Sequence, residues 1–122
     1  MARIAIVDDS RLARTFALSC LKNQDHELIE IEPTSIFDVL KELKQNPPDV
    51  VLMDYLMPNC PGLSLVRACH EDPAIGHAHI LVITAHHDDD VEERLRQLGA
   101  DGFLHKPFDP KALLDQITQL LA

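Results

Sequence analysis

The chain has 122 residues, of which 46% are hydrophobic and 25% charged, and it carries a formal net charge of −9. This length suits one domain that buries roughly two-thirds of its unfolded surface, and the composition is globular rather than disordered. The negative net charge argues against direct binding of nucleic acid, because such binding needs clustered Lys and Arg. No apolar run reaches the about 20 residues that span a bilayer.

Strand and helix signals alternate along the first half of the chain. Residues 3–7 predict a strand, and the segment 10–24 has the apolar spacing of an amphipathic helix. The residues expected on its inner stripe are Leu12, Phe16, Ala17 and Leu21. Residues 28–31 predict a second strand, and the next helix is expected to begin at a Ser35 cap and to end before Pro47.

The alternation continues to the end of the chain. Further strands are predicted at residues 50–53, 80–84 and 102–105. Helices are expected from Gly62 to the residue before Pro73, from 88 to Gly99, and from 109 to 122. Acidic residues near helix starts suit the helix dipole, and Pro110 suits a first turn.

This order of elements predicts a single α/β domain over residues 1–122. Strands that alternate with helices imply right-handed crossovers and a doubly wound parallel sheet of (βα)5 type. The runs 3–7, 50–53 and 80–84 are apolar on both faces, as expected for strands covered on both sides. A flavodoxin-like strand order 2-1-3-4-5 would make the first and third strands neighbours.

Polar residues follow the strands at their carboxyl ends. Asp8 and Asp9 follow the first strand, Asp54 the third and Lys106 the fifth, while Thr84 ends the fourth. Open parallel sheets bind ligands outside these ends, where the direction of winding reverses. We therefore expect the three carboxylates to converge within a few ångströms.

Three converging carboxylates repel one another unless a cation lies among them. Their hard oxygen atoms suit Mg²⁺, with Mn²⁺ as the alternative. Asp54 can then act as a nucleophile toward a phosphoryl group, while Lys106 offsets the accumulating negative charge. Taken singly, Asp8 and Asp9 also fit a solvated strand end or helix cap, Thr84 a plain strand residue, and Lys106 a surface lysine.

Four motifs in order carry a family resemblance. They are IVDDS at 6–10, LMDYLMPNCPG at 52–62, VITA at 82–85 and LHKPF at 104–108. With these motifs the whole chain resembles a response-regulator receiver domain of two-component signalling, of the chemotaxis-regulator type. The resemblance implies that Asp54 is the phosphoacceptor and that Asp8, Asp9, Asp54 and the backbone carbonyl of Leu56 hold Mg²⁺.

The resemblance also implies a switch. Thr84 and Lys106 would bind the phosphoryl oxygens, and Phe103 would be the aromatic residue that turns inward as Thr84 moves, with a plain core role as its alternative. The face made by the fourth helix, the fifth strand and the fifth helix would then change. An unusual peptide geometry is expected between Lys106 and Pro107.

The partners that the resemblance implies are a histidine kinase or phosphotransfer protein as phosphodonor, and a downstream protein or an output domain. A phosphorylation-dependent homodimer is a further option, and no direct contact with nucleic acid or membrane is expected. Aspartates at positions 8 and 9 argue against a secretory signal, which predicts a cytoplasmic protein. Its chemistry would be self-catalysed phosphotransfer and autodephosphorylation, not turnover of an external substrate.

Other function classes remain as alternatives. A receiver-like dimerisation or interaction module would work without phosphorylation. A Mg²⁺-dependent aspartyl-phosphate phosphatase of the haloacid-dehalogenase type would need D-x-D on the first strand, whereas Asp8 and Asp9 are adjacent. A flavodoxin-like electron carrier would need a loop rich in Ser, Thr and Gly where this chain has DDSRLAR.

Two features are particular to this chain. Leu56 stands where similar proteins often have a polar residue, so we predict slow autodephosphorylation because an apolar side chain does not orient the attacking water. His86 and His87 precede three aspartates, and the run 86–90 suits a helix start better than a transition-metal site. A milder hypothesis is that His86 makes the phosphoryl lifetime depend on pH near neutrality.

The three cysteines predict neither a disulfide framework nor a zinc site, because they are odd in number and lack a C-x-x-C spacing. Cys20 and Cys69 are expected as small helix residues. Cys60, between Pro58 and Pro61 in a stiffened loop, is considered as an exposed thiol, although redox sensing is disfavoured.

Overall fold

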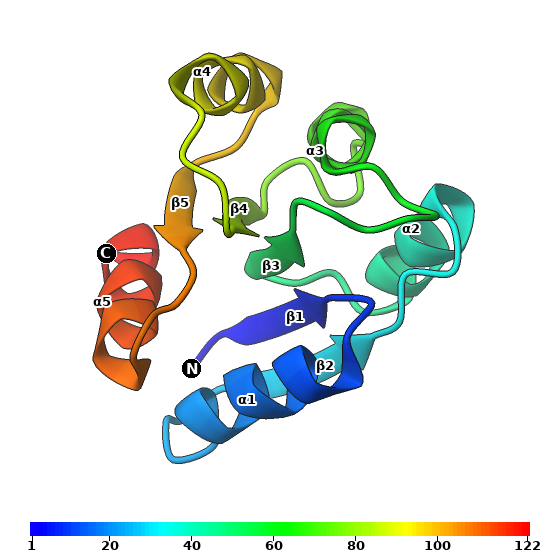
Figure 1. Cartoon of the computed structure of the whole chain (residues 1–122). Helices are drawn as coiled ribbons and strands as arrows, with labels where there is room; N and C mark the ends of the chain where they lie inside the picture. Colours follow the sequence, from blue (N-terminus) through cyan, green and yellow to red (C-terminus); the bar gives the residue numbers. More distant parts are fainter.

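The computed structural model describes all residues from 1 to 122. Strands and helices alternate strictly along the chain as β1 (Arg3–Val7), α1 (Arg11–Leu21), β2 (Glu27–Ile31), α2 (Ile36–Gln45), β3 (Val50–Asp54), α3 (Gly62–Glu71), β4 (His79–Thr84), α4 (Asp89–Leu98), β5 (Gly102–His105) and α5 (Pro110–Leu121). All strand pairs are parallel, in the order β2-β1-β3-β4-β5. The predicted doubly wound α/β fold is therefore confirmed (Figure 1).

The helix ends follow the predicted signals. The side chain of Ser35 accepts a hydrogen bond from the backbone N–H of Asp38 and so caps α2. The side chain of Asp109 caps α5 in the same way, with Pro110 in the first turn. α4 ends at Gly99, whose φ of 127° is a conformation that other residues rarely adopt.

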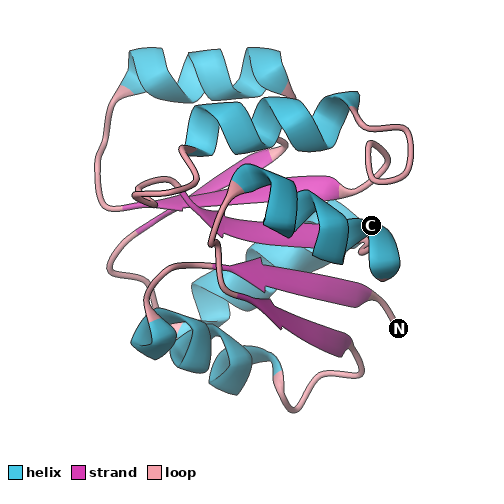
Figure 2. Cartoon of the chain, turned by 90° about the vertical axis from the view of Figure 1, so that its right-hand side faces the viewer, coloured by secondary structure: helices cyan, strands magenta, loops and turns pink.

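Helices cover both faces of the sheet (Figures 1 and 2), and a hydrophobic core lies between the sheet and each layer of helices. One core, between the sheet and α1 and α5, includes Ile4, Leu52 and Leu113. The other, between the sheet and α2, α3 and α4, includes Val51 and Leu65. Burial on both faces explains why β1, β3 and β4 read as continuous apolar runs. No helix of the structure has the length and apolar character needed to cross a membrane.

The predicted inner stripe of α1 is half wrong. Ala17 and Leu21 are buried, but Leu12 is 81% exposed and Phe16 is 41% exposed. The inner position near the start of the helix is taken by Arg14, whose Nη1 donates to the backbone carbonyl of Asp8 at 2.6 Å. A buried guanidinium is tolerated when it is paired, so Arg14 can occupy the face of α1 that is turned toward the sheet. Leu12 and Phe16 then lie on the more exposed part of the helix surface.

Candidate functional site

Three carboxylates meet at the carboxyl end of the sheet. Asp54 is the last residue of β3, and Asp8 and Asp9 directly follow β1, its neighbour. One carboxylate oxygen from each of the three lies within 4.8 Å of the others. The predicted convergence is confirmed, and its cause is the pairing of Val7 with Met53 across the two strands.

The side chains of Asp8 and Asp54 are largely shielded from solvent, since Asp8 is 6% exposed and Asp54 is 9% exposed. Burial raises the pKa of Asp54 above its ordinary value, although the Lys106 ammonium opposes this shift. Burial also raises the pKa of Asp8, against a hydrogen bond donated by the backbone N–H of Ser10. Asp9 is exposed and adds like charge to the cluster.

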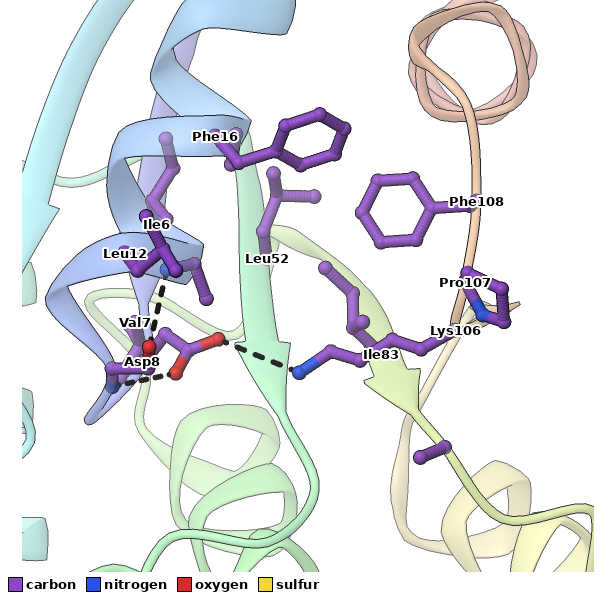
Figure 3. A pocket seen from close by; sticks show the side chains of 14 residues that line it. Ile6, Val7, Asp8, Leu12, Phe16, Leu52, Ile83, Lys106, Pro107 and Phe108 are labelled. Carbon is purple, nitrogen blue, oxygen red and sulfur yellow. Dashed lines mark hydrogen bonds and ion pairs between the residues drawn. The ribbon is translucent and has the colours of Figure 1, made fainter.

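Lys106 supplies the positive charge of the site. It follows β5, and its Nζ lies 3.4 Å from Oδ1 of Asp54 and 4.0 Å from Oδ2 of Asp8. Its side chain reaches toward Asp8 along the mouth of a groove (Figure 3). The Lys106–Pro107 peptide bond is cis, as the expectation of an unusual geometry required.

Thr84 lies beside this cluster but bonds elsewhere. Its side chain is buried at the end of β4. The backbone N–H of His86 donates to Oγ1 of Thr84 at 3.1 Å, so the loop after β4 holds the hydroxyl group. The backbone carbonyl of Thr84 accepts a hydrogen bond of 2.8 Å from the backbone N–H of Lys106, which joins the end of β4 to the residue that follows β5.

The loop after Asp54 folds back on itself. The N–H of Gly62 donates to the carbonyl of Tyr55 at 3.2 Å, and the N–H of Cys60 donates to the carbonyl of Met57 at 3.1 Å. A Cβ atom at Gly62 would lie 2.8 Å from the Tyr55 carbonyl oxygen, so a close approach requires this glycine. Leu56, two residues after Asp54, is 56% exposed at the outer side of the loop.

Comparisons with known proteins agree with this arrangement. Residues 4–118 match the family description "Response regulator receiver domain". This chain belongs to the response regulator receiver domain family. It is 31% identical to the protein PilH of Pseudomonas aeruginosa over 122 residues, covering all of this chain and 99% of PilH. It is 28% identical to the chemotaxis protein CheY of Halobacterium salinarum, covering 98% of this receiver and 96% of that protein.

A solved structure and a longer relative extend the comparison. The crystal structure of the chemotaxis response regulator CheY4 of Vibrio cholerae superimposes with a TM-score of 0.89 at 26% identity, covering 98% of each chain. The phosphate regulon transcriptional regulatory protein PhoB of Pseudomonas aeruginosa is 28% identical over 97% of this receiver. The receiver spans about half of the length of PhoB, 51%.

Two further features predicted from the sequence are the aromatic residue Phe103 and the run of histidines and aspartates at 86–90. Phe103, on β5, is half-buried against the core of α2, α3 and α4, and the guanidinium carbon of Arg96 lies 4.7 Å from the centre of its ring. Asp88 accepts hydrogen bonds from the N–H groups of Asp90 and Val91. Asp88 therefore caps α4, which begins at Asp89, while His86 and His87 lie in the loop before it. The only three-residue group able to hold a metal is that of Asp8, Asp9 and Asp54.

The hypothesis of an exposed Cys60 is wrong, because this side chain is fully buried and its burial raises the pKa of the thiol to about 11. Burial similarly raises the pKa of Cys69 to about 12. Cys20 and Cys69 lie in helices as predicted, and all three thiols are free. A protonated, buried thiol is a poor nucleophile, which removes the basis for redox sensing at Cys60.

An apolar groove beside the acidic cluster was not predicted. Its volume is about 710 Å³, and it runs between α1 and the segment after β5. Phe16 and Phe108 line it and pack against each other, with ring centres 5.6 Å apart and ring planes tilted by 55° (Figure 3). Asp8 and Lys106 line its end, so the groove is continuous with the charged site. The only sequence signal was the apolar pair Leu12 and Phe16.

Proposed function

We propose that this receiver accepts a phosphoryl group on Asp54 from a histidine kinase or phosphotransfer protein, in a Mg²⁺-dependent reaction. The observation that carries the proposal is the position of Asp54 between two further carboxylates and the Lys106 ammonium, 3.4 Å away. Phosphotransfer to Asp54 brings further negative charge to a site that already holds three carboxylates, and a bound cation together with the Lys106 ammonium would offset it. The proposed chemistry is self-catalysed transfer and loss of the phosphoryl group, without turnover of an external substrate.

The donor set fits a small hard cation. Three carboxylate oxygens lie within 4.8 Å of one another, and the backbone carbonyl of Leu56 would complete the ligands from Asp8, Asp9 and Asp54. Oxygen-only sites with free positions for water suit Mg²⁺, with Mn²⁺ as the alternative. When bound, the cation offsets the negative charge of the reacting oxygens.

The transfer itself is a displacement at phosphorus. One Oδ of Asp54 forms a bond to phosphorus as the bond between phosphorus and the donor breaks, and the bonding electrons leave with the donor's imidazole nitrogen or acyl oxygen. Lys106 would stabilise the charge on the phosphoryl oxygens. Burial of Asp54 would keep out water that competes with the donor. Burial and the nearby charge of Asp9 also raise the pKa of Asp54, so the ionised carboxylate is less stable before it reacts than it would be in water.

Movements of two residues, Thr84 and Phe103, would then transmit phosphorylation of Asp54 to the protein surface. The Thr84 hydroxyl, which donates to the carbonyl of His86 at 3.4 Å, would donate to a phosphoryl oxygen instead, and Phe103 would move from beside Arg96. These shifts would alter the face made by α4, β5 and α5, which a downstream protein, an output domain or a second copy of the receiver would recognise. A cytoplasmic location goes with such partners.

The groove next to the site suits the phosphodonor protein. Leu12 and Phe16 stand exposed on α1 at the edge of the groove, whose end is lined by Asp8 and Lys106. A protein that brings a phosphorylated imidazole to Asp54 would pass over this apolar surface, and covering it would contribute to binding.

The deciding experiment is incubation with Mg²⁺ and acetyl phosphate, followed by intact mass measurement. We expect one added phosphoryl group on the wild-type receiver and none on Asp54→Ala. An adduct that persists in Asp54→Ala would overturn the assignment of the acceptor. No adduct on the wild type, and no change of oligomer or of α4 with beryllofluoride, would leave an interaction module without phosphorylation as the function.

A further inference from the structure

Three side chains from separate segments meet on the α4 side of β5. Nε2 of His105 lies 2.7 Å from Oε2 of Glu92 on α4. The ring of His87, in the loop 85–88 between β4 and α4, stacks on the ring of His105 with centres 3.8 Å apart and planes 18° apart. An ionised carboxylate can only accept, so Nε2 of His105 is the donor in this pair.

This cluster is attached to the candidate switch through the backbone. His105 pairs with Thr84 across β4 and β5. The loop that carries His87 continues directly from Thr84, and its His86 N–H holds the Thr84 hydroxyl at 3.1 Å. Whatever fixes His87 against β5 therefore also fixes the loop that occupies the Thr84 hydroxyl.

We propose that His87, His105 and Glu92 form a proton-sensitive latch that holds the loop 85–88 against β5. When only one of the two imidazoles is charged, the charged ring of His105 pairs with Glu92 and the neutral ring of His87 stacks on it. When both are charged, two cations lie face to face at 3.8 Å, and their repulsion releases the loop. Histidines change charge between about pH 5 and 8, so the latch would open on the acid side of neutrality.

The other charged groups around the latch do not cancel a second positive charge. Glu92 is the only carboxylate within 4.0 Å of either imidazole. The carboxylate of Asp88, next to His87 in the chain, caps the N–H groups at the start of α4. Arg96, on α4, lies over Phe103 and adds positive charge to the same face, while the Lys106 ammonium points to Asp54.

The consequence for signalling rests on the proposed function, but the latch itself does not. Release of the loop would free the Thr84 hydroxyl from the His86 N–H, which lowers the cost of turning Thr84 toward a phosphoryl group. The receiver would then reach its switched state more readily in acid.

The latch is tested on the unphosphorylated receiver, without Mg²⁺ or phosphodonor. Amide hydrogen exchange of residues 85–91, divided by the intrinsic rates at each pH, gives the opening constant of the loop. We expect it to rise about tenfold from about pH 7 to about pH 5.5. His87→Phe, which keeps a stacked ring without a charge, should reduce this rise to less than about twofold.

The matched control is His77→Phe, which removes an exposed histidine outside the latch and should respond to pH as the wild type does. An opening constant that is flat with pH in the wild type, or that rises equally in His87→Phe, would overturn the latch. Ring resonances give a second test on the wild type alone: the two imidazoles should take up protons in two coupled steps, and independent single steps would also overturn it. Neither result depends on whether Asp54 accepts a phosphoryl group.

Discussion

The Nζ atom of Lys106 lies 3.4 Å from Oδ1 of Asp54, although 52 residues separate the two in the chain. The contact exists because β3 and β5 both pair with β4, so their carboxyl ends meet at one edge of the sheet. It is the one positive charge facing a carboxylate whose pKa burial raises. Loss of this ammonium should therefore raise the pKa of Asp54 further and remove the positive charge beside its carboxylate.

Replacing Lys106 with Met should slow phosphoryl transfer from acetyl phosphate by about tenfold or more, because the charge on the phosphoryl oxygens loses its stabilising partner. The rate of adduct formation, followed by intact mass, measures this. Lys111→Met is the matched control, since Lys111 pairs with Asp115 on the exposed side of α5 and should leave the rate unchanged. Equal rates for wild type and Lys106→Met would remove Lys106 from the proposed site.

The acidic cluster should cost stability at neutral pH. Burial raises the pKa of Asp8 and of Asp54 above 3.8, so the folded state holds these protons more tightly than the unfolded state. Stability from this source is present below pH 3.8 and is lost as pH rises through the folded pKa values. Asp54→Asn should therefore increase the free energy of unfolding at neutral pH by about 1 kcal/mol.

Thermal unfolding in the presence of a chelator measures this gain, which should raise Tm by about 3–6 °C. Mg²⁺ should raise the Tm of the wild type and have much less effect on Asp54→Asn, because a cation that binds only the folded state stabilises it. Asp25→Asn, at an exposed acid before the start of β2 and away from the carboxyl ends of the strands, should change neither value. A lower Tm for Asp54→Asn than for wild type would contradict the electrostatic account.

Replacing Leu56 with Asn should speed the loss of the phosphoryl group by about fivefold to tenfold, since an amide orients water that an apolar side chain does not. Leu56 is 56% exposed, so the change should not disturb folding. Leu121→Asn, also partly exposed but on α5, is the control. The decay of the phosphorylated mass after removal of the donor is the measurement, and an unchanged lifetime would contradict the shielding role of Leu56.

His86 offers a related test of the same decay. If its ring takes part in the reaction of water with the phosphoryl group, His86→Ala should flatten the dependence of the decay rate on pH near neutrality. His70→Ala changes an exposed histidine on α3 and serves as the control. The same pH profile in wild type and His86→Ala would remove this hypothesis.

The sequence was informative where the chemistry depends on strand ends. Asp8 and Asp54 could be placed together because each directly follows or ends a continuous apolar run, and parallel strands bring such ends to one edge. The strand bounds were predicted to within one residue at every end. These features depend on local pattern and on a topology that strand and helix alternation already predicts.

Features that depend on how elements rotate and fold back could not be predicted. The spacing of apolar residues in α1 does not say which side faces the sheet, and Arg14 takes the inner position because Asp8 and Glu30 satisfy its guanidinium. Cys60 is buried because its loop closes onto Met57. The contact of His105 with Glu92 depends on where α4 settles against β5, which no local pattern contains.

The apolar groove leads to a prediction that separates docking from chemistry. Phe16→Ala should weaken phosphoryl transfer from a phosphorylated histidine protein by about tenfold, because an exposed aromatic at the edge of the site is the kind of residue that dominates an interface. Transfer from acetyl phosphate, which is too small to cover the groove, should stay within about twofold of the wild type. Phe37→Ala, at the exposed aromatic of α2 on the opposite layer, is the control. Equal losses with both donors would mean that Phe16 supports the fold of the site, and no loss with either would show that the protein donor approaches Asp54 from another side.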